Sequence, residues 1–524
     1  MNIKSQIDPL FAAWDRTDAP GLALAVVRDG YVVHRRGYGL ANLEYQVPIT
    51  PTTLFNVGSI TKQFTAAAMA LLACEGKLSL DDDIRTHLPY LPDYGRPLTY
   101  RQIMNHTSGL RSSTDVLFLA GWRKEDLMTQ GDILALARRQ QDLNFAPGSE
   151  WEYSNTGYYL LAEAVQAVTG LSLGEFLQQR FFTPLGMADS LIFDDHTRSV
   201  PNRAYAYRTR RDGGLSKVVE NTSFAGGSGL LTTADDLVKW LLNFDHCEAG
   251  SPVAFELLHE RGALNGGQPF DYGLGLELQE YRGLQWVGHG GVWMGYKNYM
   301  VRIPEEKLGV IILGNIDALD PKPMAQKLVD ALLFGETIVP FTNRPARRET
   351  TDDGDFARCR GLYQLETGEI LKLYYDAQRP MALLPEGAKM ELAPVSPVEL
   401  VHVPLDIGVV FSAENTLRLR RNDQTTSGHK IDPPDLEEDR IAALVGGYYS
   451  DELDVTVRIE RGGERLTIRR RWDRDLVLLH IYGDWFLAPL FESVHFVRDE
   501  RGAVVGFTAT RRRVRNLRFK KLSI

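Results

Sequence analysis

The chain has 524 residues, of which 44% are hydrophobic, 24% charged and 10% aromatic. These values exclude a disordered or collagen-like chain, and the length predicts about three domains rather than one core. The net charge is -9, yet residues 440–524 carry 17 Lys and Arg against 11 Asp and Glu, so a basic end follows an acidic body.

Cysteine usage and the amino terminus indicate the compartment. Cys74, Cys247 and Cys359 are too few and too scattered for a disulfide framework or a thiolate metal site. The first residues lack the basic patch and apolar run of an export signal, and no apolar run reaches the roughly 18 residues that span a bilayer. We expect a cytoplasmic protein with no membrane partner.

The first two thirds of the chain mix strands and helices. Residues 22–28 and 31–35 flank Asp29-Gly30, a two-residue hairpin signal. A helical pattern at 59–75 ends at Gly76. Further helical patterns cover 157–168, 173–181, 234–243 and 324–333, and strand patterns cover 272–278, 286–288, 299–302 and 308–313. This order predicts one α/β unit whose sheet unites residues 20–40 with 270–315 and leaves a mostly helical insertion between them.

After residue 334 the long helical patterns disappear. A polar stretch at 343–355 predicts a linker, and a second one at 422–439 divides the rest in two. Arg360-Gly361-Leu362-Tyr363 resembles Gly446-Gly447-Tyr448-Tyr449 about 86 residues later, a weak internal repeat. Short alternating runs fill both halves, at 370–375, 409–412, 417–421, 455–459 and 466–470. We predict three domains, at 1–340, 341–430 and 431–524, the last two all-β meanders or barrels.

Ser59-Ile60-Thr61-Lys62 places a hydroxyl and an amine on one face at the start of a predicted helix. A serine becomes a nucleophile when a neighbouring base takes its proton, and a lysine of lowered pKa can be that base. The pattern itself is common. Ser427-Gly428-His429-Lys430 repeats it in what we interpret as a Gly/Pro-rich loop without a helix to orient the pair.

The surroundings of Ser59 are more specific than the pattern. Phe55-Asn56-Val57-Gly58 precedes it, Tyr153-Ser154-Asn155 stands about 90 residues later, and His289-Gly290-Gly291 follows. Together with Asn105-His106-Thr107-Ser108-Gly109-Leu110, these residues resemble the serine penicillin-recognising enzymes, particularly class C β-lactamases and their non-lactamase relatives, over about residues 10–335. The resemblance implies an antiparallel sheet with helices on both faces plus a helical subdomain.

The same resemblance assigns roles to four residues. Ser59 would be the nucleophile, Lys62 its activating partner, and Tyr153 the second member of the proton relay, with Asn155 orienting Lys62 and the substrate amide. A phenol can act as a base only where nearby cations favour phenolate, which Lys62 would do. The alternative for Tyr153 is an amphipathic tyrosine that caps a helix.

The third motif departs from the Lys-Thr-Gly of most β-lactamases. Here His289 replaces the lysine, so a fixed cation for a substrate carboxylate is missing and lactam hydrolysis is in doubt. Gly290 and Gly291 would let substrate backbone approach a strand edge, and the N–H groups of Ser59 and Val292 would form the oxyanion hole. The alternative for His289 is a hydrogen-bonded core histidine.

The two β modules narrow the resemblance to bacterial D-stereospecific aminopeptidases, whose last domain opens much like residues 447–454. In that family a loop of the last barrel reaches the cleft and helps to select small substrates. The corresponding loop here is 469–475, where Asp473 or Asp475 could pair with a substrate ammonium. The alternative is a solvated hairpin tip.

We therefore expect a serine hydrolase that releases N-terminal D-residues or glycine from short peptides and amino-acid amides. Alternatives are an esterase or broad amidase of the same family, or a catalytically silent binding protein. We expect no cofactor and no metal, because the 11 histidines lack ligand spacing and Asp81-Asp82-Asp83 resembles a solvated turn. The basic segment 511–521 alternates like the outer face of a strand, which favours no nucleic-acid partner, and a homodimer stays open.

Overall fold

The computed structural model describes residues 7–210, 212–336, 341 and 359–523, except, in the last range, 368, 377–378, 385–388, 397, 403–406, 414, 422–423, 433–436, 463–464, 471–474, 489, 492 and 512. The chain forms two compact units, Met1–Ala346 and Arg347–Ile524. The predicted linker at 343–355 lies outside the described residues. The domain limits given above stay predictions.

A six-stranded antiparallel sheet forms the centre of the first unit. Its order is β12 (Glu277–Tyr281), β13 (Leu284–Trp293), β14 (Tyr296–Ile303), β15 (Leu308–Gly314), β1 (Leu22–Arg28) and β2 (Tyr31–Tyr38). Leu22 pairs with Gly314 and Arg28 with Leu308, so the predicted union of the two chain segments is confirmed. Asp29 and Gly30 both have positive φ, at 53° and 81°, as a tight hairpin turn between twisted strands requires.

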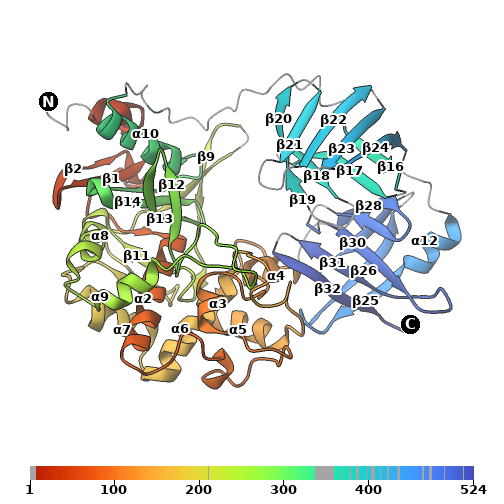
Figure 1. Ribbon diagram of the computed structural model, residues 1–524, viewed down its shortest axis with the longest axis horizontal. Helices are drawn as coiled ribbons and strands as arrows, with labels where there is room; N and C mark the ends of the chain where they lie inside the picture. Colours follow the sequence, from red (N-terminus) through yellow and green to blue (C-terminus); the bar gives the residue numbers. More distant parts are fainter. Residues whose placement is uncertain are drawn as a thin grey trace. The chain divides into compact units, whose positions relative to one another are not determined.

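Helices cover both faces of this sheet, because successive side chains of a strand point to opposite sides. Ala23 and Val27 of β1 belong to the core that also holds residues of α2 and α8, whereas Leu24 and Val26 belong to the core that holds residues of α10 and of the amino-terminal turn η1. Figure 1 shows α10 on one face of the sheet and α8 on the other. The predicted α/β fold with helices on both faces is confirmed.

The remaining elements of this unit are mostly short. Its helices are η1 (Asp8–Trp14), α2 (Thr61–Cys74), α3 (Tyr100–Met104), α4 (Ser113–Leu119), α5 (Gln130–Arg139), α6 (Asn155–Thr169), α7 (Leu173–Leu177), α8 (Ala234–His246), α9 (Pro252–Leu258) and α10 (Pro321–Phe334), with single turns η2 (Gly58–Ile60), η3 (Ile84–Thr86), η4 (Gln178–Phe182) and η5 (Pro304–Glu306). The small strands are β3 (Leu40–Asn42), β4 (Val47–Pro48), β5 (Phe55–Asn56), β6 (Met128–Thr129), β7 (Leu191–Ile192), β8 (Ala206–Thr209), β9 (Leu215–Val218), β10 (Thr222–Ser223) and β11 (Leu230–Thr232).

The predicted helix at 173–181 is confirmed, as α7 continues directly into the π-helical turn η4. Two other sequence predictions in this unit need correction. The predicted strand at 272–278 is wrong over most of its length, because β12 begins only at Glu277. Ser59 lies in the turn η2 and not in a helix, since α2 begins at Thr61.

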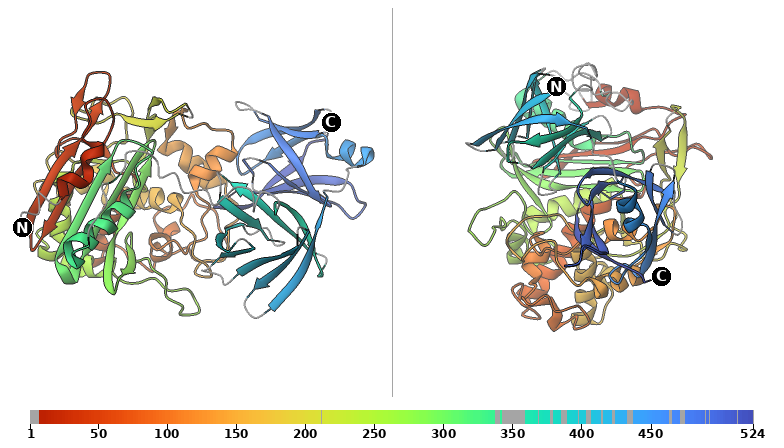
Figure 2. Two further views of the ribbon diagram at one scale, coloured as in Figure 1. Left: turned by 90° about the horizontal axis from the view of Figure 1, so that it is seen from above. Right: turned by 90° about the vertical axis from the view of Figure 1, so that its right-hand side faces the viewer.

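The described residues of the second unit form strands apart from α12 (Glu438–Leu444), which agrees with the predicted all-β class. A nine-stranded sheet contains β16 (Gly361–Leu365), β17 (Ile370–Asp376), β18 (Arg379–Leu383), β19 (Lys389–Glu391), β20 (Ala393–Ser396), β21 (Glu399–His402), β22 (Ile407–Ala413), β23 (Thr416–Arg421) and β24 (Gln424–Ile431). A closed barrel contains β25 (Gly446–Ser450), β26 (Val455–Gly462), β27 (Arg465–Arg469), β28 (Leu476–Tyr482), β29 (Trp485–Leu487), β30 (Ser493–Arg498), β31 (Val504–Arg511) and β32 (Val514–Lys521). Figure 2 shows the nine-stranded sheet in turquoise and the barrel in blue.

The internal repeat is structural as well as sequential. Tyr363 of β16 is buried and donates to the carbonyl oxygen of Cys359 at 2.9 Å, and Tyr448 of β25 is buried and donates to that of Leu444 at 2.7 Å. In both sheets the first strand pairs with the last, β16 with β24 and β25 with β32. The nine-stranded sheet is therefore a relative of the barrel that stays open between β19 and β20.

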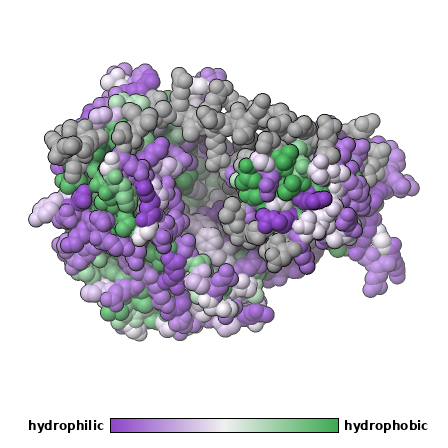
Figure 3. All heavy atoms as spheres, turned by 45° about the horizontal axis from the view of Figure 1, so that its top comes forward, coloured by the Kyte–Doolittle hydropathy of each residue, from purple (hydrophilic) through white to green (hydrophobic). Residues whose placement is uncertain are grey.

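The surface carries apolar side chains in limited patches. Figure 3 shows mostly hydrophilic atoms over the visible face of the first unit, and a cluster of apolar atoms on the second. In β32 the apolar residues Val514, Leu517 and Phe519 are buried while Arg515, Arg518 and Lys520 face outward or partly so, which confirms the predicted strand alternation of the basic segment.

Candidate active site

A close approach between two backbone segments places Ser59. Gly58 has φ +55°, and a Cβ there would lie 2.9 Å from the backbone nitrogen of Val292 in β13. A Cβ on Gly291 would overlap the carbonyl oxygen of Val57. Asn298 of β14 ties the same segments together by donating to the carbonyl oxygens of Asn56 and Gly291, at 3.0 and 3.3 Å. The glycines therefore bring the serine turn against the edge of β13.

The ammonium of Lys62 lies one helical turn beyond Ser59 and is fully buried. Its Nζ donates to three oxygens, namely Ser59 Oγ at 3.2 Å, Asn155 Oδ1 at 2.8 Å and the carbonyl oxygen of Gly227 at 2.7 Å. Burying an ammonium is costly unless its hydrogen bonds are made, and these three acceptors satisfy all three N–H groups. The amine is therefore held in contact with the serine hydroxyl.

Asn155 is the first residue of α6 and connects Lys62 to the helical part of the unit. Its Nδ2 donates to Thr114 Oγ1 at 3.3 Å, which leaves Oδ1 directed at Lys62. The ring of Tyr153, two residues earlier, has its centroid 4.8 Å from Lys62 Nζ, and the ring of Tyr158 lies at 5.2 Å. An ammonium over an aromatic face is attracted by the ring, so both tyrosines contribute to holding the buried charge.

His289 of β13 forms the opposite side of this group and is only 3% exposed. Its Nε2 lies 2.9 Å from the hydroxyl of Tyr272, and its Nδ1 lies 2.6 Å from the carbonyl oxygen of Gly290. Burial, followed by the positive charge of Lys62, lowers the pKa of His289 below its usual value, against the opposing effect of Glu277. The imidazole is thus a neutral group beside a buried ammonium.

The oxyanion position can be read only from the backbone. Val292 follows Gly291 on the strand edge, and its side chain is 59% exposed. Its backbone nitrogen lies against Gly58, directly before Ser59. The arrangement joins a serine hydroxyl, a buried amine, a phenol and a strand-edge N–H, which together suit acyl transfer to serine.

Comparison with known proteins agrees with this chemistry. The family model described as Beta-lactamase matches residues 9–333. The chain belongs to the β-lactamase family. A D-aminopeptidase from Brucella canis is 30% identical over 523 residues, which is 96% of each chain, and one from Gluconobacter oxydans is 30% identical over 317 residues, 60% of each chain. The octameric penicillin-binding protein homologue from Pyrococcus abyssi is 25% identical with a TM-score of 0.58 and covers 81% of this chain and 99% of that one.

The two predicted residues of the loop at 469–475 in this β-lactamase-family chain stay predictions. Asp473 lies outside the described residues, and Asp475 is exposed between β27 and β28 of the second unit. The predicted loop at Ser427–Lys430 is wrong, because these residues belong to β24. Among the described residues, no group of three or more His, Cys, Asp or Glu side chains could hold a metal ion.

The residues of the site that were not predicted include Gly227 and Tyr272. The Gly227 carbonyl and the Tyr272 hydroxyl both contact it, but a carbonyl has no residue signature and Tyr272 occurs in what resembled a strand. His106 could have been found from the sequence, since it belongs to the motif at 105–110.

Among the described residues, no individual helix has the length and apolar composition needed to span a membrane. Asn155–Thr169 and Leu173–Phe182 meet that test only as a pair, which is bent by 74°.

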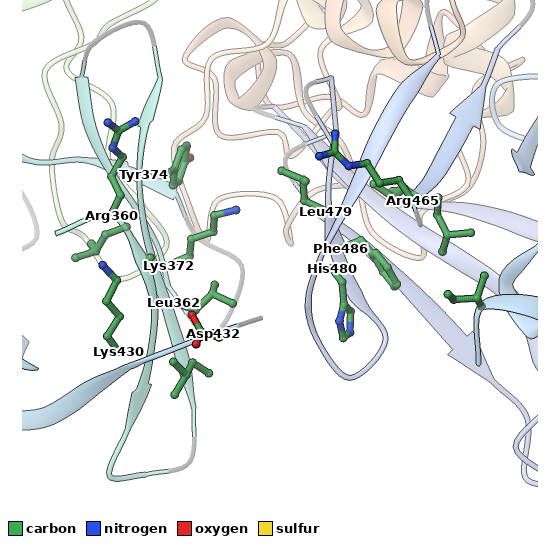
Figure 4. A pocket seen from close by; sticks show the side chains of 16 residues that line it. Arg360, Leu362, Lys372, Tyr374, Lys430, Asp432, Arg465, Leu479, His480 and Phe486 are labelled. Carbon is green, nitrogen blue, oxygen red and sulfur yellow. The ribbon is translucent and has the colours of Figure 1, made fainter. Parts of the chain in front are cut away.

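A pocket of about 580 Å³ lies within the second unit, between its two sheets. Figure 4 shows Lys372 and Tyr374 of β17 on one side and Leu479 and His480 of β28 on the other. Its described lining combines apolar side chains, among them Leu362, Leu466 and Phe486, with basic ones such as Arg360, Lys372 and Lys430.

Proposed function

We propose that this chain is a serine hydrolase that uses Ser59 to cleave the amide bond after an N-terminal D-residue or glycine in short peptides and amino-acid amides. The observation that carries the proposal is the contact of the buried Lys62 amine with Ser59 Oγ at 3.2 Å. Relatives named D-aminopeptidase that align over 96% of the chain support the substrate class.

The chemistry follows from the contacts. In the form with a neutral amine, Lys62 takes the proton of Ser59 as Oγ attacks the substrate carbonyl, and the N–H groups of Ser59 and Val292 stabilise the oxyanion. The C–N bond breaks as Tyr153 and Lys62 deliver the proton to the leaving amine. Water then attacks the acyl ester on Ser59 and gives a proton to the pair, and the pair passes this proton to Oγ as the acyl C–O bond breaks, which releases the carboxylic acid and restores the Ser59 hydroxyl.

The neutral character of His289 supports an amine-bearing substrate. A fixed cation at this position would attract a carboxylate, whereas a neutral imidazole leaves Lys62 as the nearby charge. A substrate with a free α-ammonium then meets less repulsion.

We extend the proposal to residues 469–475, which would limit substrate size. Replacing this loop with a short Gly-Ser turn should raise the activity on longer peptides relative to D-alanine amide.

The direct test uses purified wild type and Ser59→Ala with three substrates, namely D-alanine amide, L-alanine amide and a short-chain ester. Wild type should prefer D-alanine amide, and Ser59→Ala should be inactive on all three. A preference for the ester would favour the esterase alternative and keep the nucleophile. Undiminished activity of Ser59→Ala would reject the mechanism.

We also propose a cytoplasmic location, which is supported by three cysteines that form no disulfide. Cell fractionation tests this location.

A further inference from the structure

A line of buried side chains crosses the catalytic unit from the Tyr153 segment to β13. The backbone N–H of Ser154 donates to Nδ1 of His106 at 3.2 Å. Nε2 of His106 lies 3.3 Å from the hydroxyl of Tyr272, and that hydroxyl lies 2.9 Å from Nε2 of His289. His106, Tyr272 and His289 are 1%, 4% and 3% exposed, so water does not compete for these bonds.

The two ends of this line determine its polarity. An N–H group can only donate, so Nδ1 of His106 must accept, and a neutral His106 carries its proton on Nε2. A carbonyl can only accept, so Nδ1 of His289 must donate to Gly290 at 2.6 Å. In the neutral state of His289, Nε2 is unprotonated and accepts the single proton of Tyr272, while the Tyr272 oxygen accepts from His106. Every donor in the line meets an acceptor.

We propose that His106 and Tyr272 are positioning residues that hold His289 as the neutral tautomer protonated on Nδ1. They also connect the Tyr153–Asn155 segment to β13, because Ser154 lies between Tyr153 and Asn155, and the His106 and Tyr153 ring centroids are 4.2 Å apart. A change in these hydrogen bonds should therefore alter both the charge of His289 and the position of Tyr153.

The charges around His289 favour the same state. Lys62 of α2 and Lys322 of α10 oppose a second positive charge, whereas Glu277 of β12 favours it. Tyr153 faces His289 with ring centroids 6.2 Å apart, and Met300 pairs with it on β14. Burial and the two lysines lower the pKa of His289, whereas Glu277 raises it. The Glu277 carboxylate is itself 3.5 Å from the ammonium of Lys322. This balance supports the neutral state of His289, and the hydrogen bonds to Tyr272 and Gly290 assign its tautomer.

Tyr158 offers a competing arrangement for the proton of Tyr272. The Tyr158 hydroxyl donates to the carbonyl oxygen of Met104 at 2.6 Å, and its oxygen can accept from Tyr272. If Tyr272 donated to Tyr158, His289 could carry a second proton on Nε2. Tyr158→Phe removes this acceptor and leaves the contact between Tyr272 and His289 in place. It is therefore a matched control for Tyr272→Phe in the same buried cluster.

The experiment is ¹⁵N NMR of the full chain labelled in histidine, with the His289 signals assigned by their loss in His289→Gln. In wild type, long-range ¹H–¹⁵N correlations should show His289 protonated on Nδ1 and unprotonated on Nε2 from pH 8 down to about 6. An Nε2-protonated tautomer or an imidazolium at pH 7 would overturn the proposal. The tautomer is measured on the wild-type chain without substrate, and His289→Gln serves only to assign the signals.

The variants test the role of Tyr272. Tyr272→Phe removes a hydrogen bond to the neutral imidazole, so the titration midpoint of His289 should rise by roughly 0.5–1 pH unit or its tautomers should mix. Tyr158→Phe should leave the wild-type spectrum. An unchanged spectrum in Tyr272→Phe, or an equal change in both variants, would show that Tyr272 does not position His289.

One consequence rests on the proposed function. In Tyr272→Phe at pH 6, partial charge on His289 should raise KM several-fold for D-alanine amide, which bears an ammonium, and not for a short-chain ester without an amine. At pH 7.5 the two KM values should approach those of wild type. Wild type that turns over neither substrate would reject the proposed function, whereas the NMR measurements would still decide the tautomer of His289 and the role of Tyr272.

Discussion

The same four-residue pattern occurs twice in this molecule with opposite results. Ser59 and Lys62 lie in a turn that continues into α2, and Nζ contacts Oγ at 3.2 Å. Ser427 and Lys430 lie on β24, where Ser427 pairs with Arg418 and Lys430 with Tyr363. Their backbones belong to an extended ladder between β16 and β23.

Backbone periodicity explains the difference. Residues three apart in a helical turn share a face, whereas residues three apart in a strand point to opposite faces. Burial adds a second difference, since Lys62 is fully buried among acceptors while Lys430 is partly exposed. A Ser and a Lys at this spacing therefore form a catalytic pair only where the chain is helical and the amine is desolvated.

The largest expected effect comes from removing the hydroxyl group of each serine in turn. Ser59→Ala should lower kcat by about four to six orders of magnitude, because no acyl ester can form. Ser427→Ala should retain wild-type kcat and KM. Steady-state assays on D-alanine amide measure both, and equal thermal unfolding midpoints would show that neither change acts through folding. Comparable losses in the two variants would contradict the assignment of Ser59.

The amine gives the second comparison. Lys62→Met keeps the length of the side chain but removes the base, so kcat/KM should fall about 10²–10⁴-fold. Lys430→Met should change kcat/KM less than twofold. Burst kinetics with an activated ester would localise the loss, since Lys62→Met should slow acylation of Ser59 itself. A normal burst with slow turnover would assign Lys62 to deacylation only.

Gly291 and Gly428, which lie beside the two Ser-Lys pairs, provide a third comparison. The expected losses of unfolding free energy on substitution by alanine are about 3 and about 1 kcal/mol. In Gly291→Ala the new Cβ would overlap the Val57 carbonyl oxygen, which is backbone and cannot rotate away. In Gly428→Ala it would lie 2.9 Å from a terminal methyl of Leu365, which can move. Urea unfolding should therefore show a loss of about 3 kcal/mol or more for Gly291→Ala and about 1 kcal/mol or less for Gly428→Ala.

Activity should separate these glycine variants as well. Displacing the Val57 segment moves Ser59 relative to Val292, so Gly291→Ala should lose activity even under conditions where it remains folded. Gly428→Ala should stay active. A fully active Gly291→Ala would mean that the close approach of the two segments does not position the nucleophile.

Local patterns predicted the parts of the fold that local interactions decide. The hairpin at Asp29-Gly30 and the helix before Gly76 have turn residues that specify them, and both occur, although the helix begins at Thr61 rather than at Ser59. The strand at Ser427 was mistaken for a loop because Gly428 and the nearby prolines suggested one. Its pairing partners, β16 and β23, supply the ladder hydrogen bonds that override this local composition.

The site divides in the same way. A resemblance in short motifs brought Ser59, Lys62 and Asn155 together, and the structure places these three in hydrogen-bond contact. The hydroxyl of Tyr272 lies 166 residues along the chain from His106, which it contacts. Nothing in the spacing of the two residues predicts this bond, because only the packing of the helical part against the sheet creates it.

The smallest expected effect concerns the histidines beside the two pairs, His289 and the exposed His429. Burial lowers the pKa of His289 in the folded chain, so near and below pH 6.5 the unfolded chain binds a proton that the folded chain does not. Unfolding free energy must then decrease as the pH falls, by at most about 1.4 kcal/mol per pH unit from this one group. The contribution is present above pH 6.5 and is lost below it.

Urea unfolding of wild type, His289→Gln and His429→Gln between pH 5 and 8 isolates this contribution. His259 and His495 also have lowered pKa values through burial, so wild type should lose stability in acid from several groups at once. His289→Gln should show a shallower dependence than wild type, and His429→Gln should follow wild type. Identical slopes in all three proteins would mean that His289 takes up its proton without unfolding. The charge of the His289 imidazole would then be set by its access to solvent rather than by its buried hydrogen bond to Tyr272.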